Sequence, residues 1–258
     1  MAKESGASRA WKKWGEINPY FGVLTDDSFR LDRFDESARE RFLRTGEAHI
    51  EELFATIREH LAADFQPRVS VDFGCGTGRL GIPLARRSGA VIGIDVSDAM
   101  IEEARKNCDR QSIANVQFAT SVDQLKAVAK GGYDFVHSFI VFQHIPIRDG
   151  MRIFEALLTG LNPDGVVALH FTLHRDKSLM RRAGAWATTH VPLLHRLRQI
   201  VRGRPAGDPP MQMNAYDLSL ILAALHREGM PWAIVRTTDH GGYIGAMVIA
   251  KKQSIAAF

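Results

Sequence analysis

Apolar residues follow two alternating patterns between residues 65 and 173. Short, mostly apolar runs are typical of buried strands, and longer stretches with apolar positions three and four residues apart are typical of amphipathic helices. The predicted strands are Val69–Phe73, Ala90–Ile94, Val116–Ala119, Tyr133–Phe139 and Gly165–Thr172. The predicted helices between them are Arg79–Ser88, Asp98–Asn107, Val122–Ala129 and Ile147–Thr159. This alternation predicts βαβ units and a doubly wound, mostly parallel α/β sheet.

The end of the chain adds two further strands to this sheet. A helix is predicted at about Ala215–Glu228, followed by strands at Trp232–Thr237 and Tyr243–Ala250. The link between those two strands, Thr238–Gly242, is too short for a parallel crossover. We therefore expect a seven-stranded sheet that ends in an antiparallel hairpin.

The beginning of the chain is less regular. Residues 1–34 show no clear periodicity, so we expect an irregular arm that carries the aromatic side chains of Trp14, Tyr20 and Phe21. A long helical pattern follows at about Glu36–Ala63, and Asp35 is placed to cap it.

Composition limits the class of protein. The chain has 258 residues, of which 45% are hydrophobic and 24% charged, which is globular composition. It has only two cysteines, Cys75 and Cys108, so we expect a reducing, cytoplasmic environment rather than a disulfide scaffold. The apolar stretch Phe135–Ile147 is too short to span a bilayer, and the amino terminus lacks the apolar region of a signal peptide.

Positive charge gathers in one segment. The net charge is only +4, but eight Arg or Lys residues stand against one acid between His170 and Pro205. Such an excess favours an anionic partner or surface, although a solvated helix face is the commoner reason. The apolar residues of 174–205 lie opposite Arg196, Arg198 and Arg202. The segment can cover a pocket, dimerise or lie on a membrane surface.

Glycines separate the first predicted strand from the helix after it. They stand at Gly74, Gly76 and Gly78, so the dinucleotide spacing G-x-G-x-x-G is not met. A loop of this kind lets the backbone approach a ligand at a helix N-terminus, or simply makes a tight turn. Asp95 ends the second strand, 21 residues beyond Gly74, where a carboxylate accepts ribose hydroxyls or caps the next helix.

These motifs give the sequence a resemblance to the class I S-adenosylmethionine-dependent methyltransferases. It covers about residues 65–173 and 213–251 and is carried by five segments in the order and spacing of that family. They are Val71–Leu80 with the glycine loop, Gly93–Met100, Tyr133–Val136, Phe142–Pro146 (Phe-Gln-His-Ile-Pro) and Leu161–Gly165 (Leu-Asn-Pro-Asp-Gly).

The resemblance implies a cofactor, S-adenosyl-L-methionine, and residues that bind it. Asp72 and the loop glycines would hold the amino and carboxylate groups, and Asp95 the ribose. The other implied cofactor contacts are Cys75, as a packing group, Val96 and Met100 beside the adenine, Ser121 or Val122 at its edge, and Ser138 and Phe139 at the methionine portion.

Ligands of open α/β sheets bind beyond the carboxyl ends of the strands, where several histidines are expected. His144 is the candidate general base for a hydroxyl acceptor, since histidine titrates near neutral pH; its alternative role is to order the loop. His240 is a second catalytic candidate, unless its glycines simply make the hairpin turn. We predict no metal, because Val141, Phe142 and Gln143 stand where related enzymes hold metals with acids.

The expected substrate contacts are Gln143 and His174 at the strand ends and Trp14, Tyr20 and Phe21 in the arm. His137 should point away from the pocket, because it alternates with Ser138. The expected organisation is a single domain over 1–258, with an N-terminal helical lid (1–64), a cofactor-binding core (65–173), a helical substrate-cap insertion (174–212) and a last helix with the hairpin (213–258).

The sequence therefore predicts a small-molecule methyltransferase, acting on oxygen first of all. The alternatives are an N- or C-acceptor, then a nucleic-acid methyltransferase, then a non-catalytic cofactor-binding scaffold; a nicotinamide oxidoreductase is the weakest, because the glycine spacing is wrong. The acceptor and the choice between monomer and homodimer stay open.

Overall fold

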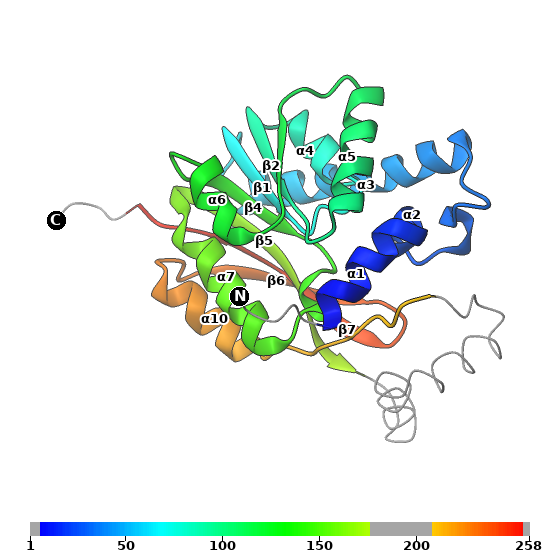
Figure 1. Ribbon diagram of the computed structural model, residues 1–258. Helices are drawn as coiled ribbons and strands as arrows, with labels where there is room; N and C mark the ends of the chain where they lie inside the picture. Colours follow the sequence, from blue (N-terminus) through cyan, green and yellow to red (C-terminus); the bar gives the residue numbers. More distant parts are fainter. Residues whose placement is uncertain (1–5, 176–207, 255–258) are drawn as a thin grey trace.

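The computed structural model, which describes residues 6–175 and 208–254, has a seven-stranded sheet in the order β3-β2-β1-β4-β5-β7-β6 (Figure 1). The strands are β1 Val69–Phe73, β2 Ala90–Ile94, β3 Val116–Ala119, β4 Tyr133–Ser138, β5 Leu161–Arg175, β6 Ala233–Asp239 and β7 Tyr243–Lys251. Strands β1 to β5 are parallel, and β7 is antiparallel to both β5 and β6. The predicted sheet and its terminal hairpin are confirmed.

Helices cover both faces of the sheet (Figure 1). Those of the described residues are α1 Gly6–Ile17, α2 Pro19–Val23, α3 Glu36–His60, α4 Gly81–Ala85, α5 Asp98–Arg110, α6 Val122–Val128, α7 Ile147–Thr159 and α10 Leu218–Arg227, with short 3₁₀ turns η1 Asp27–Phe29 and η2 Phe142–His144. On one face α6, α7 and α10 pack around Phe154 and Phe171, and on the other α3 and α4 pack around Phe54 and Phe135. All four of these rings are fully buried.

Three of the helices begin at a side chain that accepts a backbone N–H of the first turn. Asp35 caps α3 at 2.7 Å, Ser97 caps α5 at 3.3 Å and Asp217 caps α10 at 2.8 Å. Each cap satisfies a donor that has no partner within its helix. The predicted cap at Asp35 is thus confirmed.

The expectation of an irregular arm over residues 1–34 is wrong for much of its length. Trp11, Trp14 and Ile17 stand three residues apart, so in α1 they form one apolar stripe that packs against Met100 of α5. Pro19 then starts α2, where its missing N–H costs nothing. The stripe was too short to stand out among the polar residues around it.

Several boundaries also differ from the prediction. The helix expected at Arg79–Ser88 is limited to α4, and β5 runs on to Arg175 because it stays paired with Tyr243 of β7. Of the predicted insertion 174–212, residues 176–207 lie outside the described residues, and with them Arg196, Arg198 and Arg202. Residues 208–217 lead to α10 without regular secondary structure.

The direction of strand order reverses between β1 and β4, which pair in parallel side by side. At such a reversal the loops after the two strands part, and ligands of open α/β sheets bind there. Within the described part of the chain, every helix is too short or too polar to cross a membrane.

Helix α3 closely approaches the backbone between β1 and α4 at Gly46, where a Cβ would overlap the carbonyl oxygen of Arg79. Alanine normally stabilises a helix interior relative to glycine by about 1 kcal/mol. We expect Gly46→Ala to destabilise instead, by about 1–3 kcal/mol in urea unfolding, because two backbones must separate. The control is Ala48→Gly at an exposed position of the same helix. This variant should be destabilised only by the lower helix propensity of glycine. A stabilised Gly46→Ala protein would contradict this packing.

Candidate active site

The loop after β1 has a backbone that only glycine adopts easily. Gly74, Gly76 and Gly78 all have positive φ, at 76°, 53° and 85°. A Cβ on Gly74 would overlap the side chain of Val141, and one on Gly76 that of Val23. The glycines thus serve both the turn and the close approach of the segments that cover it.

Asp95 joins this loop to the end of β2. Its Oδ2 accepts the Gly76 N–H and its Oδ1 the Ser97 N–H, both at 2.9 Å. Desolvation raises the pKa of this carboxyl to about 6, against the opposing effect of the two N–H groups. Ser97 caps α5, so Asp95 is not the capping residue of that helix.

Asp72 faces the α3 side of the sheet and is buried. Its Oδ1 lies 3.1 Å from His137 Nδ1, and its Oδ2 has no hydrogen-bond partner. His137 in turn lies 3.1 Å from His49 of α3 through their Nε2 atoms. The guanidinium of Arg79 is buried beside Asp72, and this burial lowers its pKa to about 10.

The remaining predicted cofactor residues divide between the two faces of the sheet. Cys75 packs its thiol against Gly93, and burial raises its pKa well above the usual value. Ser138 donates to the carbonyl of Phe73 at 2.8 Å, which ties β4 to β1. The ring of Phe139 instead lies 4.3 Å from that of His49, on the α3 side.

The predicted adenine side lies at the ends of β2 and β3. The N–H of Asp95 donates to the carbonyl of Ala119, so the residues after β3 follow close to Val96. Ser121 precedes α6 without a capping hydrogen bond, and Val122 packs partly on the core.

Two of the predicted substrate residues of the arm are core residues. Trp14 and Phe21 are both 2% exposed, and their rings lie 5.5 Å apart against Met100. Gly15 permits this approach, because a Cβ there would overlap Ser97 Oγ. Helices α1 and α2 thereby cover the start of α5, beside Asp95.

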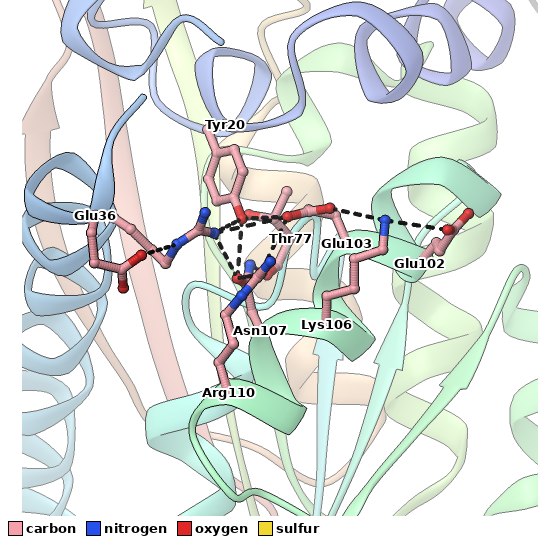
Figure 2. Close-up of polar contacts among 9 residues, drawn as sticks. Tyr20, Glu36, Thr77, Glu102, Glu103, Lys106, Asn107 and Arg110 are labelled. Carbon is pink, nitrogen blue, oxygen red and sulfur yellow. Dashed lines mark hydrogen bonds and ion pairs between the residues drawn. The ribbon is translucent and has the colours of Figure 1, made fainter. Parts of the chain in front are cut away.

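Tyr20 is anchored to α5 rather than pointing at open space. Its hydroxyl donates to Glu103 at 2.6 Å, lies 3.0 Å from Asn107 Oδ1 and accepts from Arg39 of α3 (Figure 2). Burial and the bond to Glu103 raise the pKa of Tyr20 to about 12. Burial alone would raise the pKa of Glu103, but Tyr20 and the charges of Lys106 and Arg110 hold it below its usual value.

His144 is held in one orientation at the end of β4. Its Nδ1 lies 2.7 Å from the carbonyl of Gln212, which accepts and so places the proton on Nδ1. Its Nε2 faces the amide nitrogen of Gln143 at 3.2 Å, and Gln143 Oε1 accepts from Thr172 at 2.6 Å. The Trp11 ring lies 4.7 Å away. Burial lowers the pKa of His144 to about 4, well below the ordinary histidine range.

The other predicted residues of the strand ends, His240, His174 and Gln143, have different surroundings. His240 lies with its ring 5.2 Å from His170 and 5.9 Å from Phe139, and burial lowers its pKa. His174 lines a hollow of about 270 Å³ with Ile147, Leu173 and Asn214. Gln143 does accompany His144, and its carbonyl accepts the Asn214 N–H at 2.6 Å.

Sequence reasoning missed His49 and the partner of His137. It placed His137 on the far side of the strand from Ser138, which is where it contacts Asp72. The neighbouring strands bring these two residues into register. Polar residues at alternate positions of β1, Ser70 and Asp72, were the available signal. His49 comes from a helix whose register against the strands no pattern gives.

A family model described as a methyltransferase domain matches residues 71–165. The match begins in β1, contains the glycine loop, Asp95 and His144, and ends in β5.

Residues 71–165, from β1 into β5, are thus similar to methyltransferase domains.

Curated relatives match part of the length of this chain. A ubiquinone biosynthesis O-methyltransferase of Acinetobacter baylyi is 33% identical over 125 residues, which is 48% of this chain and 51% of the relative. The 23S rRNA (uracil(1939)-C(5))-methyltransferase RlmD of Pectobacterium carotovorum is 29% identical over 151 residues, 55% of this chain and 32% of the relative. The chain thus spans about half or less of these relatives.

Solved structures share the fold of this chain over nearly all of its length. Magnesium protoporphyrin IX methyltransferase (ChlM) from Synechocystis PCC 6803, with bound SAH, has a TM-score of 0.62 at 18% identity, covering 96% of this chain and 100% of that one. The N-methyltransferase NodS from Bradyrhizobium japonicum WM9, in complex with SAH, has a TM-score of 0.57 at 13% identity, covering 97% and 100%.

The Tyr20 contacts predict how firmly the protein holds the helices α1 and α2. Tyr20→Phe should cost about 1–2 kcal/mol, because Glu103 and Arg39 lose a buried partner. Hydrogen exchange should speed up selectively in α1 and α2. The wild type should lose this contribution as the pH falls below the usual glutamate range, since the pKa of Glu103 is depressed.

The control for Tyr20→Phe is Tyr133→Phe, which removes a buried hydroxyl bonded to Leu157 at 2.7 Å. It should lower global stability and leave exchange in α1 and α2 as it is. Equal exchange in the two variants would mean that Tyr20 does not anchor these helices.

Proposed function

We propose that this protein transfers a methyl group from S-adenosylmethionine to a small-molecule acceptor, with a hydroxyl oxygen as the acceptor atom and His144 as the base. The observation that carries the proposal is the arrangement around the strand-order reversal. A glycine loop at positive φ lies between two acids, Asp72 and Asp95, and a histidine follows the neighbouring strand.

The residues present fit that cofactor. The Oδ2 atom of Asp72 is buried without a partner, which suits an ammonium group. Each oxygen of Asp95 accepts one N–H and keeps a further lone pair for a ribose hydroxyl. When bound, S-adenosylmethionine supplies a methyl group on a positively charged sulfur, which a nucleophile displaces in line. Holding the acceptor in attack geometry supplies much of the rate.

His144 is suited to remove a proton from a hydroxyl. Because Nδ1 donates to the Gln212 carbonyl, the lone pair of the ring lies on Nε2. The Gln143 amide donates into that lone pair, so an acceptor hydroxyl has to take the place of this amide. Trp11 of α1 covers the ring and limits water. The low pKa keeps His144 neutral throughout the physiological range.

The similar proteins support both the cofactor and the acceptor atom of this proposal. The ChlM and NodS structures contain bound SAH, the demethylated cofactor. The ubiquinone biosynthesis relative is an O-methyltransferase, which favours oxygen, whereas NodS is an N-methyltransferase, which keeps nitrogen as the alternative acceptor atom.

Two measurements test the function as a whole. Isothermal titration should detect S-adenosylmethionine and S-adenosylhomocysteine but not NAD. Incubation with S-adenosylmethionine labelled in the methyl group, together with a panel of phenols, carboxylates and amines, should transfer label to one class of acceptor. If the cofactor does not bind, the proposal is wrong.

Asp95 should make cofactor binding depend on pH. Its pKa lies at about 6, so the charged acceptor is lost as the pH falls through that value. We expect S-adenosylhomocysteine affinity to fall by up to about tenfold per pH unit below this point. Asp95→Asn should weaken binding at pH 8 by about 1.5–3 kcal/mol and flatten the pH profile.

The stability of the free protein provides a check on Asp95. A raised pKa means that the folded state binds this proton more readily than the unfolded chain, so the contribution of Asp95 to stability is present below about pH 4 and is lost as the pH rises through about 6. Binding and this part of stability should therefore change in opposite directions. A binding profile that is flat between pH 5 and 8 would exclude the role of Asp95.

His144→Ala should lower turnover by about 10²–10⁴-fold and leave cofactor affinity nearly unchanged. The acid limb of the wild-type profile should lie near pH 4, because burial lowers the pKa of His144 to about 4. The exposed His226, replaced by Ala, is the control. Turnover within about threefold of wild type would remove His144 as the base and favour an N- or C-acceptor, which proximity alone can serve.

A further inference from the structure

Three polar side chains form a connected row beneath α3. Asp72 of β1, His137 of β4 and His49 of α3 are linked by two contacts of 3.1 Å. Asp72 is 1% exposed and His137 is fully buried. His137 therefore has both ring nitrogens committed, one to the carboxylate and one to a second imidazole.

The proton positions in this row leave one oxygen of Asp72 free. Burial lowers the pKa of His49 to about 2, so this ring is neutral. If His49 donates to His137, then His137 donates its Nδ1–H to Asp72; if His137 is charged, it donates to both neighbours. In either arrangement Asp72 Oδ1 accepts from His137, and Oδ2 remains without a partner.

The free oxygen lies beside the start of α4, the helix that follows the glycine loop. The nearest atom that a Cβ on Gly81, the first residue of α4, would meet is Asp72 Oδ2, at 3.4 Å. Arg79 is close enough to be influenced electrostatically by Asp72 but makes no hydrogen bond to it in the structure. A buried carboxylate oxygen with no partner is costly, so its presence calls for a ligand that completes it.

We propose that His137 is a positioning residue for the cofactor: it holds Asp72 by one oxygen so that the other oxygen is presented to the ammonium group of the methionine moiety. This inference rests on the proposed function, since it requires S-adenosylmethionine in the loop. His49 supports the ring of His137 from α3 and so couples that helix to the site.

A purely structural role of His137 would affect all ligands of the loop alike. 5′-Methylthioadenosine separates the two roles, because it keeps the adenosine and the sulfur of S-adenosylhomocysteine but lacks the ammonium and carboxylate groups. The ratio of the two dissociation constants is thus a measure of the amino-acid end alone.

The experiment measures both affinities by titration calorimetry in the wild type and in three variants. His137→Leu removes the donor to Asp72, and we expect it to weaken S-adenosylhomocysteine by about tenfold or more and methylthioadenosine by less than about threefold. His137→Asn keeps an N–H near the position of Nδ1 and should preserve the ratio. His170→Leu removes an equally buried imidazole from β5 and should leave the ratio unchanged.

Wild-type protein provides a second measurement that requires no substitution. The Nδ1–H proton of His137, observed by NMR after ¹⁵N labelling of histidine, should shift on addition of S-adenosylhomocysteine and stay in place with methylthioadenosine. This measurement tests the positioning role of His137 if the His137→Leu variant does not fold.

Failure of the two proposals can be told apart. A wild type that binds neither ligand overturns the proposed function, and this inference with it. A wild type that binds both, with the same ratio in His137→Leu or with no selective shift of the His137 proton, overturns the positioning role only.

Discussion

The arrangement of the site depends on one carbonyl group, that of Ile94 at the end of β2. It accepts the N–H groups of both Gly74 and Cys75, at 2.7 and 3.0 Å, and so bends the chain sharply as it leaves β1. The bend is possible because the following turn uses glycines at positive φ. The bend directs the Gly76 N–H toward Asp95, whereas Asp72 stays within β1, before the loop. Both acids of the site therefore owe their positions to backbone geometry rather than to each other.

A second constraint comes from the residue after β4. Ile140 has a φ of 60°, which a β-branched residue adopts only under strain. This conformation turns the chain so that Val141 covers Gly74 and η2 follows with Gln143 and His144. The strained backbone of Ile140 thus lies directly before the segment that carries His144.

The sequence predicted what local patterns determine. Strand and helix periodicity gave the seven strands, and the short Thr238–Gly242 link gave the hairpin. The glycine loop and Asp95 were also predicted, and the structure brings them together. The contacts between elements were not accessible, because periodicity shows that a face is buried but not what it meets. Tyr20 was therefore expected to line a pocket, whereas it bonds to Glu103, and His49 went unnoticed.

The buried ion pair between Arg30 and Asp208 has a consequence for the order in which the protein forms. The two side chains meet at 2.8 Å across 178 residues of chain, and Arg30 also lies over the ring of Phe21. During synthesis α1, α2 and Arg30 leave the ribosome before their partners on α5 and at Asp208. Helices α1 and α2 must therefore wait, with Trp14 and Phe21 uncovered, while the strands assemble. Two helices that are made before the sheet are thus among the last elements to be completed.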